Sequence, residues 1–189
     1  MSDASRWLEA LGASRDVVSY AETIDGDVAA FWQACPRGDW LLAVALRTRG
    51  GEDAARTSAI LDAGVAIAAL GLDYLPDDDA HARAVHAQLS RACRGEPPPS
   101  VDDVSALERD ADDAPDPAVS FARRAIVVAA RAVRHDDDAD LEDLAVVPSL
   151  VAQAAAHDAG DCAMISAASF VLRKSAELLR AHVAPPPTE

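Results

Sequence analysis

The sequence predicts an all-α protein, a single compact multi-helix domain of packed helical hairpins. Apolar residues recur at spacings of three and four residues along most of the chain, the period of an amphipathic helix. No run alternates β-branched and polar residues as a half-buried strand would. Half of the 189 residues are hydrophobic but only 4% are aromatic, so alanine fills much of the core. We expect one domain, with a solenoid-like stack of hairpins as the alternative arrangement.

The N-terminal helical half, residues 1–95, is predicted to contain short helices followed by longer ones. The longest apolar run, Ala59 to Leu72, is shorter than the roughly 20 residues that span a bilayer, and it carries Asp62. We therefore expect a buried core helix rather than a membrane span. The helices expected in this half lie near Ser5 to Leu11, Asp16 to Thr23, Asp27 to Ala34, Trp40 to Thr48, Asp53 to Leu70 and Asp79 to Arg94.

The composition changes at residues 96–116, where Glu96-Pro97-Pro98-Pro99 opens a segment rich in carboxylates. Arg109 is its one cationic side chain. We expect an exposed, acidic, proline-rich crossover between the two halves. The spacing of Val101, Val104 and Leu107 suits one short docked helical turn.

The C-terminal helical half, residues 117–184, is predicted to hold the longest helices. Pro117 suits the first turn of a helix whose apolar stripe runs from Ala118 to Val133. Pro148 should start a new helix after a kink. The last helix is expected from Asp161 to Val183, with Asp161 as its N-cap. Residues 185–189 are predicted to form a flexible tail.

The stretch Ala34-Cys35-Pro36-Arg37-Gly38-Asp39-Trp40-Leu41-Leu42 predicts a corner between two helices. Pro36 cannot donate a hydrogen bond to a continuing helix, and Gly38 permits a positive φ. Asp39 is a favoured N-cap for the next helix. We expect Trp40 to be a largely buried anchor and Arg37 to pair with a nearby acid.

The charge balance indicates which partners suit the chain. A formal net charge of −15, with one lysine against sixteen arginines, argues against binding a nucleic-acid backbone and favours a basic protein partner. The alternative is that the acidic surface only keeps the protein soluble. Two aspartate runs are predicted to be solvated helix-start clusters and to contribute to partner binding. Their residues are Asp77, Asp78, Asp79, Asp136, Asp137 and Asp138.

The sequence does not indicate catalytic, metal or cofactor chemistry. It has no glycine-rich phosphate loop or nucleophile elbow. His81 and His86 are five residues apart, which points them to different sides of a helix. A calcium-loop pattern that begins at Asp136 has Leu141 and Val147 where glycine and glutamate are required. We therefore predict a non-enzymatic protein with no cofactor.

The cysteines and the N-terminus bear on the compartment. Cys35, Cys93 and Cys162 are about sixty residues apart, which matches neither a disulfide framework nor a zinc site. Reduced and mostly buried thiols are expected. A nucleophilic thiolate at Cys35 would need a histidine partner, and the sequence places none there. No secretory signal or membrane span is recognised, so a cytoplasmic location is predicted. The oligomeric state is not indicated.

With the corner and its flanking helices in view, the chain resembles the immunity proteins of bacterial polymorphic toxin systems. Those alanine-rich helical proteins carry a segment similar to Ala34 to Leu42, then long helices and an arginine near the end, as in Leu178-Leu179-Arg180. Ala43-Val44-Ala45 lacks the second aromatic residue expected after the motif, and the acidic segment after Glu96 interrupts the usual alanine run. The resemblance implies a small cytoplasmic protein that neutralises a toxin by stoichiometric binding.

That resemblance implies no catalytic residues. Two other classes of function stay open at this point. One is a helical scaffold or adaptor that recruits a regulatory partner, and the other is an enzyme without a recognisable motif.

Overall fold

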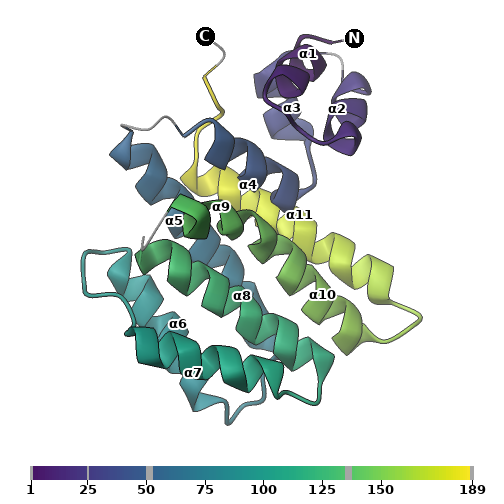
Figure 1. The fold of residues 1–189 in the computed structure, drawn as a ribbon. Helices are drawn as coiled ribbons and strands as arrows, with labels where there is room; N and C mark the ends of the chain where they lie inside the picture. The colour runs from purple at the N-terminus through teal and green to yellow at the C-terminus, as the bar shows by residue number, and fades with distance from the viewer. Residues whose placement is uncertain (1, 25, 50–52, 135–137, 188–189) are drawn as a thin grey trace.

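The computed structural model describes residues 2–24, 26–49, 53–134 and 138–187, and every regular element in these ranges is a helix (Figure 1). The predicted all-α class is confirmed. The α-helices are α1 (Asp3–Ala10), α2 (Arg15–Glu22), α3 (Val28–Ala34), α4 (Gly38–Arg47), α5 (Ala54–Ala69), α6 (Ala80–Ala92), α7 (Val101–Asp112), α8 (Pro117–Arg134), α9 (Asp138–Asp143), α10 (Val147–Ala159) and α11 (Met164–His182). Two 3₁₀ turns, η1 (Leu70–Tyr74) and η2 (Leu144–Val146), follow α5 and α9.

Several helices begin where a side chain accepts a hydrogen bond from a backbone N–H that the helix itself leaves unpaired. Asp27 accepts from the amide of Ala30 at 2.9 Å, and Asp53 accepts from that of Arg56 at 2.9 Å. Ser100 caps α7 through the amide of Asp103 at 3.1 Å. These caps are local, since each joins residues only three apart in the sequence.

The helices from α5 onward run up and down, so that successive connections alternate between the two ends of a bundle (Figure 1). α5 packs against α4, α6, α8, α10 and α11, while α8 packs against α5, α6, α7 and α10. The hairpins therefore surround two central helices and do not stack in a single solenoid-like row. One core cluster of buried residues extends from Ala4 to Val183 and includes both halves of the chain.

The corner before α4 forms as predicted, but for different reasons at two positions. Gly38 is not among the glycines with positive φ. A Cβ there would lie 2.8 Å from the backbone nitrogen of Ala176, so the glycine allows α4 to touch α11. Asp39 does not cap the helix, because Arg37 is the N-cap residue and no side-chain cap bond forms. Asp39 instead accepts two hydrogen bonds from Arg37, at 2.9 and 2.6 Å.

The aromatic residues beside this corner also differ from expectation. Trp40 is only partly buried. Its ring contacts that of Tyr20 edge-on, with the two centroids 5.7 Å apart, and the Arg37 guanidinium lies 4.6 Å from the centroid of the Trp40 ring. The fully buried aromatic side chains are Phe31 and Trp32. Arg180 of α11 donates to the carbonyl oxygens of Trp32, at 2.8 Å, and of Cys35. The arginine near the C-terminus thus ties α11 to the end of α3.

The segment predicted as an exposed crossover contains a three-turn helix, α7, which packs against α8. Val104 and Leu107 are buried as expected, whereas Val101 is 54% exposed. The helix over 101–112 is longer than the short docked turn that was expected, and Ser100 caps it through the amide of Asp103. Asp102 and Asp103 lie in the first turn of α7, where negative charge is favoured by the helix dipole.

The C-terminal helices agree in outline with the prediction. Pro148 lies in the first turn of α10, after η2, as expected. α11 begins at Met164 rather than Asp161, and its N-cap residue Ala163 provides no side-chain bond, so the predicted Asp161 cap is absent. The tail is not wholly free, because Pro186 is buried.

Within the described ranges, one helical segment, Ala54–Tyr74, has the length and mean hydropathy, 1.4, of a membrane-spanning helix. The core helix of a soluble protein meets the same criteria. The packing of α5 against five neighbouring helices matches the predicted core helix.

Candidate functional site

Three connections that lie at one end of the bundle carry exposed carboxylates and no lysine or arginine (Figure 1). They are the α5–α6 connection at 73–79, the α7–α8 connection at 113–116 and the α10–α11 turn at 158–161. We name this surface the acidic end. Its exposed carboxylates belong to Asp73, Asp77, Asp78, Asp113, Asp116, Asp158 and Asp161.

A ring stack links α8 to α10, and the negative charge of Asp158 acts on Tyr74 of η1. The ring of Phe121 in α8 stacks on that of His157 in α10, with centroids 5.5 Å apart and an interplanar angle of 19°. Burial raises the pKa of Tyr74, and the negative charges of Asp73 and Asp158 raise it further. Asp158 therefore lies within electrostatic reach of η1, although it is distant in sequence.

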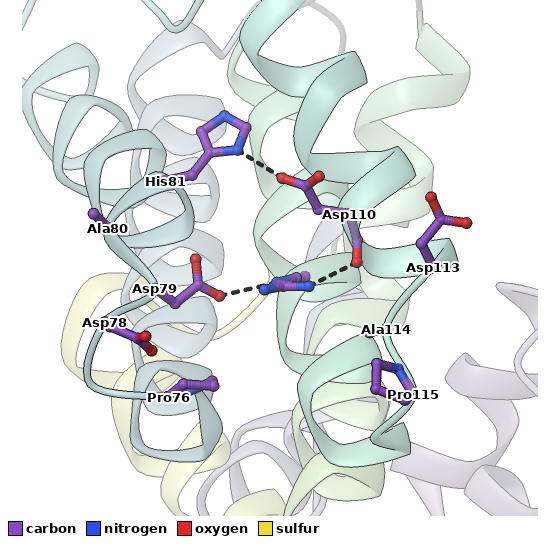
Figure 2. A pocket seen from close by; sticks show the side chains of 10 residues that line it. Pro76, Asp78, Asp79, Ala80, His81, Asp110, Asp113, Ala114 and Pro115 are labelled. Atoms are coloured by element: carbon purple, nitrogen blue, oxygen red, sulfur yellow. Dashed lines mark hydrogen bonds and ion pairs between the residues drawn. The ribbon is translucent and has the colours of Figure 1, made fainter.

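A pocket of about 550 Å³ opens on the acidic end between the start of α6 and the end of α7 (Figure 2). Arg123 and Asp79 meet at its inner side, where the Nε of Arg123 lies 2.9 Å from Oδ2 of Asp79. The two side chains are 19% and 4% exposed. The Nη1 of Arg123 also donates to the carbonyl oxygen of Asp110 at 2.7 Å. Arg123 thus joins α8 to both α6 and α7.

Asp79 was predicted to be a solvated partner-binding carboxylate, and its solvation is contradicted by the structure. Its Oδ1 accepts from the amide of Ala82 at 3.1 Å, which caps α6, while Oδ2 pairs with Arg123. The physical reason lies in the tertiary structure: Asp79 is the member of the run that faces inward, and Arg123 of α8 lies beside it. Asp77 and Asp78 remain exposed, as predicted.

The rim of the pocket carries three carboxylates, from Asp78, Asp110 and Asp113. Nδ1 of His81 lies 2.8 Å from Oδ2 of Asp110, a contact that bridges α6 and α7. Figure 2 shows Asp78 and Asp113 on opposite sides of the opening. Neither has an ion-pair partner among the residues that the structure describes. Exposed carboxylates without a partner offer only acceptor atoms, which suit a cationic side chain.

The charge of the pocket lining follows from its members. It contains four carboxylates, from Asp78, Asp79, Asp110 and Asp113, and one guanidinium, from Arg123. With His81 neutral, the formal charge is −3. The lining therefore favours a lysine or arginine side chain over an anionic group.

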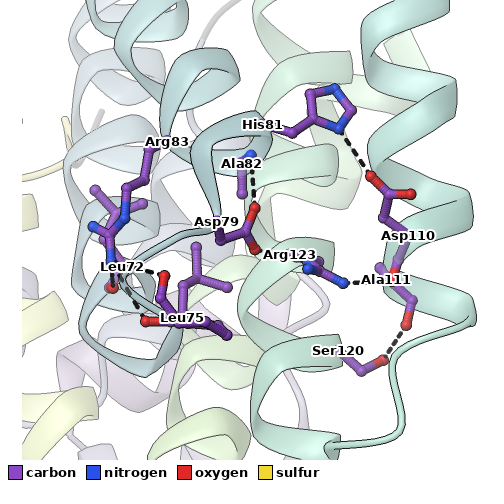
Figure 3. A network of polar contacts seen from close by, with 11 residues as sticks. Leu72, Leu75, Asp79, His81, Ala82, Arg83, Asp110, Ala111, Ser120 and Arg123 are labelled. Atoms are coloured by element: carbon purple, nitrogen blue, oxygen red, sulfur yellow. Dashed lines mark hydrogen bonds and ion pairs between the residues drawn. The ribbon is translucent and has the colours of Figure 1, made fainter.

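A network of polar contacts holds the rim in place (Figure 3). Arg83 donates to the carbonyl oxygens of Leu72 and Leu75, at 3.3 and 3.4 Å, which fixes the α5–α6 connection. Ser120 donates to the carbonyl oxygen of Ala111 at 2.7 Å, which fixes the α7–α8 connection. The carboxylates of the rim therefore project from connections whose backbone is anchored to helices.

The second predicted aspartate run does not join this surface. Asp136 and Asp137 lie outside the described residues. Asp138 is the first residue of α9, which follows the C-terminal end of α8. The acidic end lies at the N-terminal end of α8, so the structure does not bring Asp138 together with Asp77 and Asp78.

The cysteines are held in their protonated form where they are buried. Burial raises the pKa of the Cys35 thiol to about 11. Burial, followed by contact with Asp62, raises the pKa of Cys93 to about 12. Cys162 is exposed, so the expectation of mostly buried thiols fails there. A thiolate nucleophile needs a lowered pKa, and neither the buried Cys35 nor the half-buried Cys93 has one.

The histidines give no metal site in the part of the chain that the structure describes. His86 is buried, with Nε2 3.2 Å from the carbonyl oxygen of Val65, and His81 lies at the pocket rim. No group of three or more potential metal ligands gathers in the described ranges.

The sequence alone did not indicate His81, Asp110, Asp113 or Arg123 as members of a site. Each looks like an ordinary charged residue in or beside a helix. One available signal was the antiparallel order of the helices, because alternate connections in such a bundle meet at one end.

Comparison with known proteins does not assign the chain to a family. No protein-family model, curated protein or solved structure matches it. The resemblance to immunity proteins around Cys35 to Leu42 thus stays a prediction.

Proposed function

We propose that this chain is a cytoplasmic, non-enzymatic protein that binds a basic protein partner, and that the partner is a toxin domain which it neutralises. The acidic end is the observation that supports this function best. It gathers exposed carboxylates from three connections at one end of the bundle, and two of these connections line a pocket with a formally negative lining. The family resemblance supplies the toxin as the kind of partner.

Charge supports this proposal in two ways. The net charge of −15 attracts a basic protein from a distance, which accelerates encounter. At short range, Asp78 and Asp113 can each accept hydrogen bonds from a lysine or arginine of the partner. The anchored backbone of the rim reduces the entropy that would be lost in ordering these groups on binding.

The test is a titration of the full chain against the protein encoded by the neighbouring reading frame, as its candidate toxin. We expect a 1:1 complex by calorimetry and protection of cells that express the toxin. Absence of both would refute toxin neutralisation. Stable incorporation into a multi-protein assembly, without protection, would favour the adaptor alternative.

A pair of variants tests the role of the acidic end in that complex. Asp78→Asn with Asp113→Asn should slow association by about tenfold at low salt, because long-range steering is weakened. The matched control is Asp102→Asn with Asp143→Asn, two exposed carboxylates outside the acidic end. The difference in association rate between the two double variants should vanish near 1 M salt, where the Debye length is about 3 Å. Equal association rates for the two double variants would exclude the acidic end as the binding surface.

A further inference from the structure

Exposed large apolar side chains are concentrated at the start of α11. Among the described residues, five such side chains are exposed, and three of them lie within one short stretch. Met164 is 36%, Ile165 80% and Phe170 54% exposed. Exposed apolar groups that gather in one place, surrounded by polar residues, are typical of protein interaction sites.

Met164 and Ile165 border the acidic end. They follow directly on the α10–α11 turn, which carries Asp158 and Asp161. The stack of Phe121 on His157 joins the last turn of α10 to the early part of α8. The two apolar side chains therefore lie beside the carboxylates of the α10–α11 turn, at the same end of the bundle as the other two connections (Figure 1).

Phe170 marks the border of this surface. It lies more than one turn further along α11, and the ammonium of Lys174 lies 6.0 Å from its ring centroid. Lys174 is the one lysine in the chain and pairs with Glu177 at 2.8 Å. Phe170 thus has a cation beside it, whereas Met164 and Ile165 follow the turn that carries Asp158 and Asp161.

We propose that Met164 and Ile165 form the apolar anchor of the partner-binding surface, and that the partner presents an apolar recess surrounded by lysine or arginine. This inference rests on the proposed function, since it assigns the residues beside the acidic end that give tight binding. Buried apolar side chains at the centre of an interface usually contribute most of the binding energy, while charges at the rim mainly set the association rate.

Charge complementarity favours a basic protein as the partner over a second copy of this chain or an anionic membrane. A second copy of the chain would bring one set of exposed aspartates against another, in a molecule of net charge −15. An anionic membrane would be repelled by the same carboxylates. A basic protein is attracted to the rim and can cover the apolar anchor.

Defined peptides can test this inference on the full chain. The probe is a labelled amphipathic helix of leucine and lysine, measured by fluorescence anisotropy. A serine–lysine peptide of equal length and charge lacks the apolar face, and a leucine–glutamate peptide reverses the charge. We expect the leucine–lysine peptide to bind most tightly, because it alone combines both features.

Ile165→Ser should raise the Kd of the leucine–lysine peptide by about tenfold and leave the serine–lysine peptide unchanged. The matched control is Val101→Ser, since Val101 is 54% exposed but lies at the opposite end of α7 from the pocket. Because both positions are exposed, neither variant should alter the thermal unfolding temperature, which circular dichroism checks.

The possible outcomes distinguish the apolar anchor from the basic partner on which it rests. If both lysine peptides bind but Ile165→Ser behaves like Val101→Ser, the apolar anchor is refuted while the basic partner remains supported. If the leucine–glutamate peptide binds as tightly as the leucine–lysine peptide, the proposed basic partner is itself refuted, and the anchor with it. Failure of both lysine peptides to bind would refute both proposals.

Discussion

Replacing Arg123 with methionine would leave the carboxylate of Asp79 buried without its cation. The Asp79 side chain is 4% exposed and lies 2.9 Å from the guanidinium, so water cannot readily replace the lost partner. Removal of one member of a buried ion pair typically destabilises a protein by about 3 to 5 kcal/mol. Arg123 is itself 19% exposed, and the hydrogen bond from Ala82 to Asp79 survives. We therefore expect a loss of about 3 kcal/mol.

The assay is urea unfolding at pH 7 followed by circular dichroism, with Arg124→Met as the matched control. Arg124 is the next residue of the same helix and pairs with Asp112 at the same distance, 2.9 Å, but its side chain is 47% exposed. A surface ion pair contributes about 0 to 1 kcal/mol, so the control should lower the free energy of unfolding by no more than that. The two variants remove the same charge from neighbouring positions of one helix, so the difference between their free energies of unfolding reports the effect of burial.

A third variant measures the coupling between Asp79 and Arg123. Asp79→Asn keeps an oxygen that can cap α6 but removes the buried charge, so in combination with Arg123→Met it should recover part of the lost stability. We expect a coupling energy of about 1 to 3 kcal/mol between the two positions. If Arg123→Met lowered the free energy of unfolding no more than Arg124→Met does, or if the coupling energy were zero, the Arg123–Asp79 pair would not be what stabilises the packing of α8 on α6 beneath the pocket.

Three further predictions concern the core and its titratable groups. Gly38→Ala should destabilise by about 1 to 3 kcal/mol in urea unfolding because the new methyl group would meet the backbone of α11, and an unchanged midpoint would contradict that contact. Cys162 should react with a thiol reagent at pH 8 in the native state far faster than Cys35 or Cys93, since burial raises the pKa of Cys35 to about 11 and of Cys93 to about 12. Burial lowers the pKa of His86 below its ordinary value of 6.5, so the unfolded chain binds a proton more readily than the native protein does. The free energy of unfolding should therefore fall as the pH drops below about 6.5, and His86→Gln should flatten that part of the pH profile if His86 is responsible.

The helices themselves could be predicted because their signals are local. Periodic apolar residues, capping aspartates and serines, and prolines in first turns all act within a few residues of chain. The helix at 101–112 shows how such signals can be overlooked: Ser100 and two first-turn aspartates favour a helix, but the acidic composition suggested a crossover. Asp161 shows the reverse, because a favourable residue type offers a cap that the structure does not use.

The sequence by itself determined the all-α class, most helix positions, the buried character of α5 and the acidic surface. Those properties depend on residue type and on neighbours along the chain. Only the tertiary structure decided that Asp79 turns inward to Arg123, that Gly38 touches α11 and that three connections distant in sequence form one acidic end. The physical reason is that each of these outcomes depends on which helix packs against which. Many helix arrangements can bury the same alanine-rich faces, whereas a buried ion pair or a close backbone contact forms in only one of them.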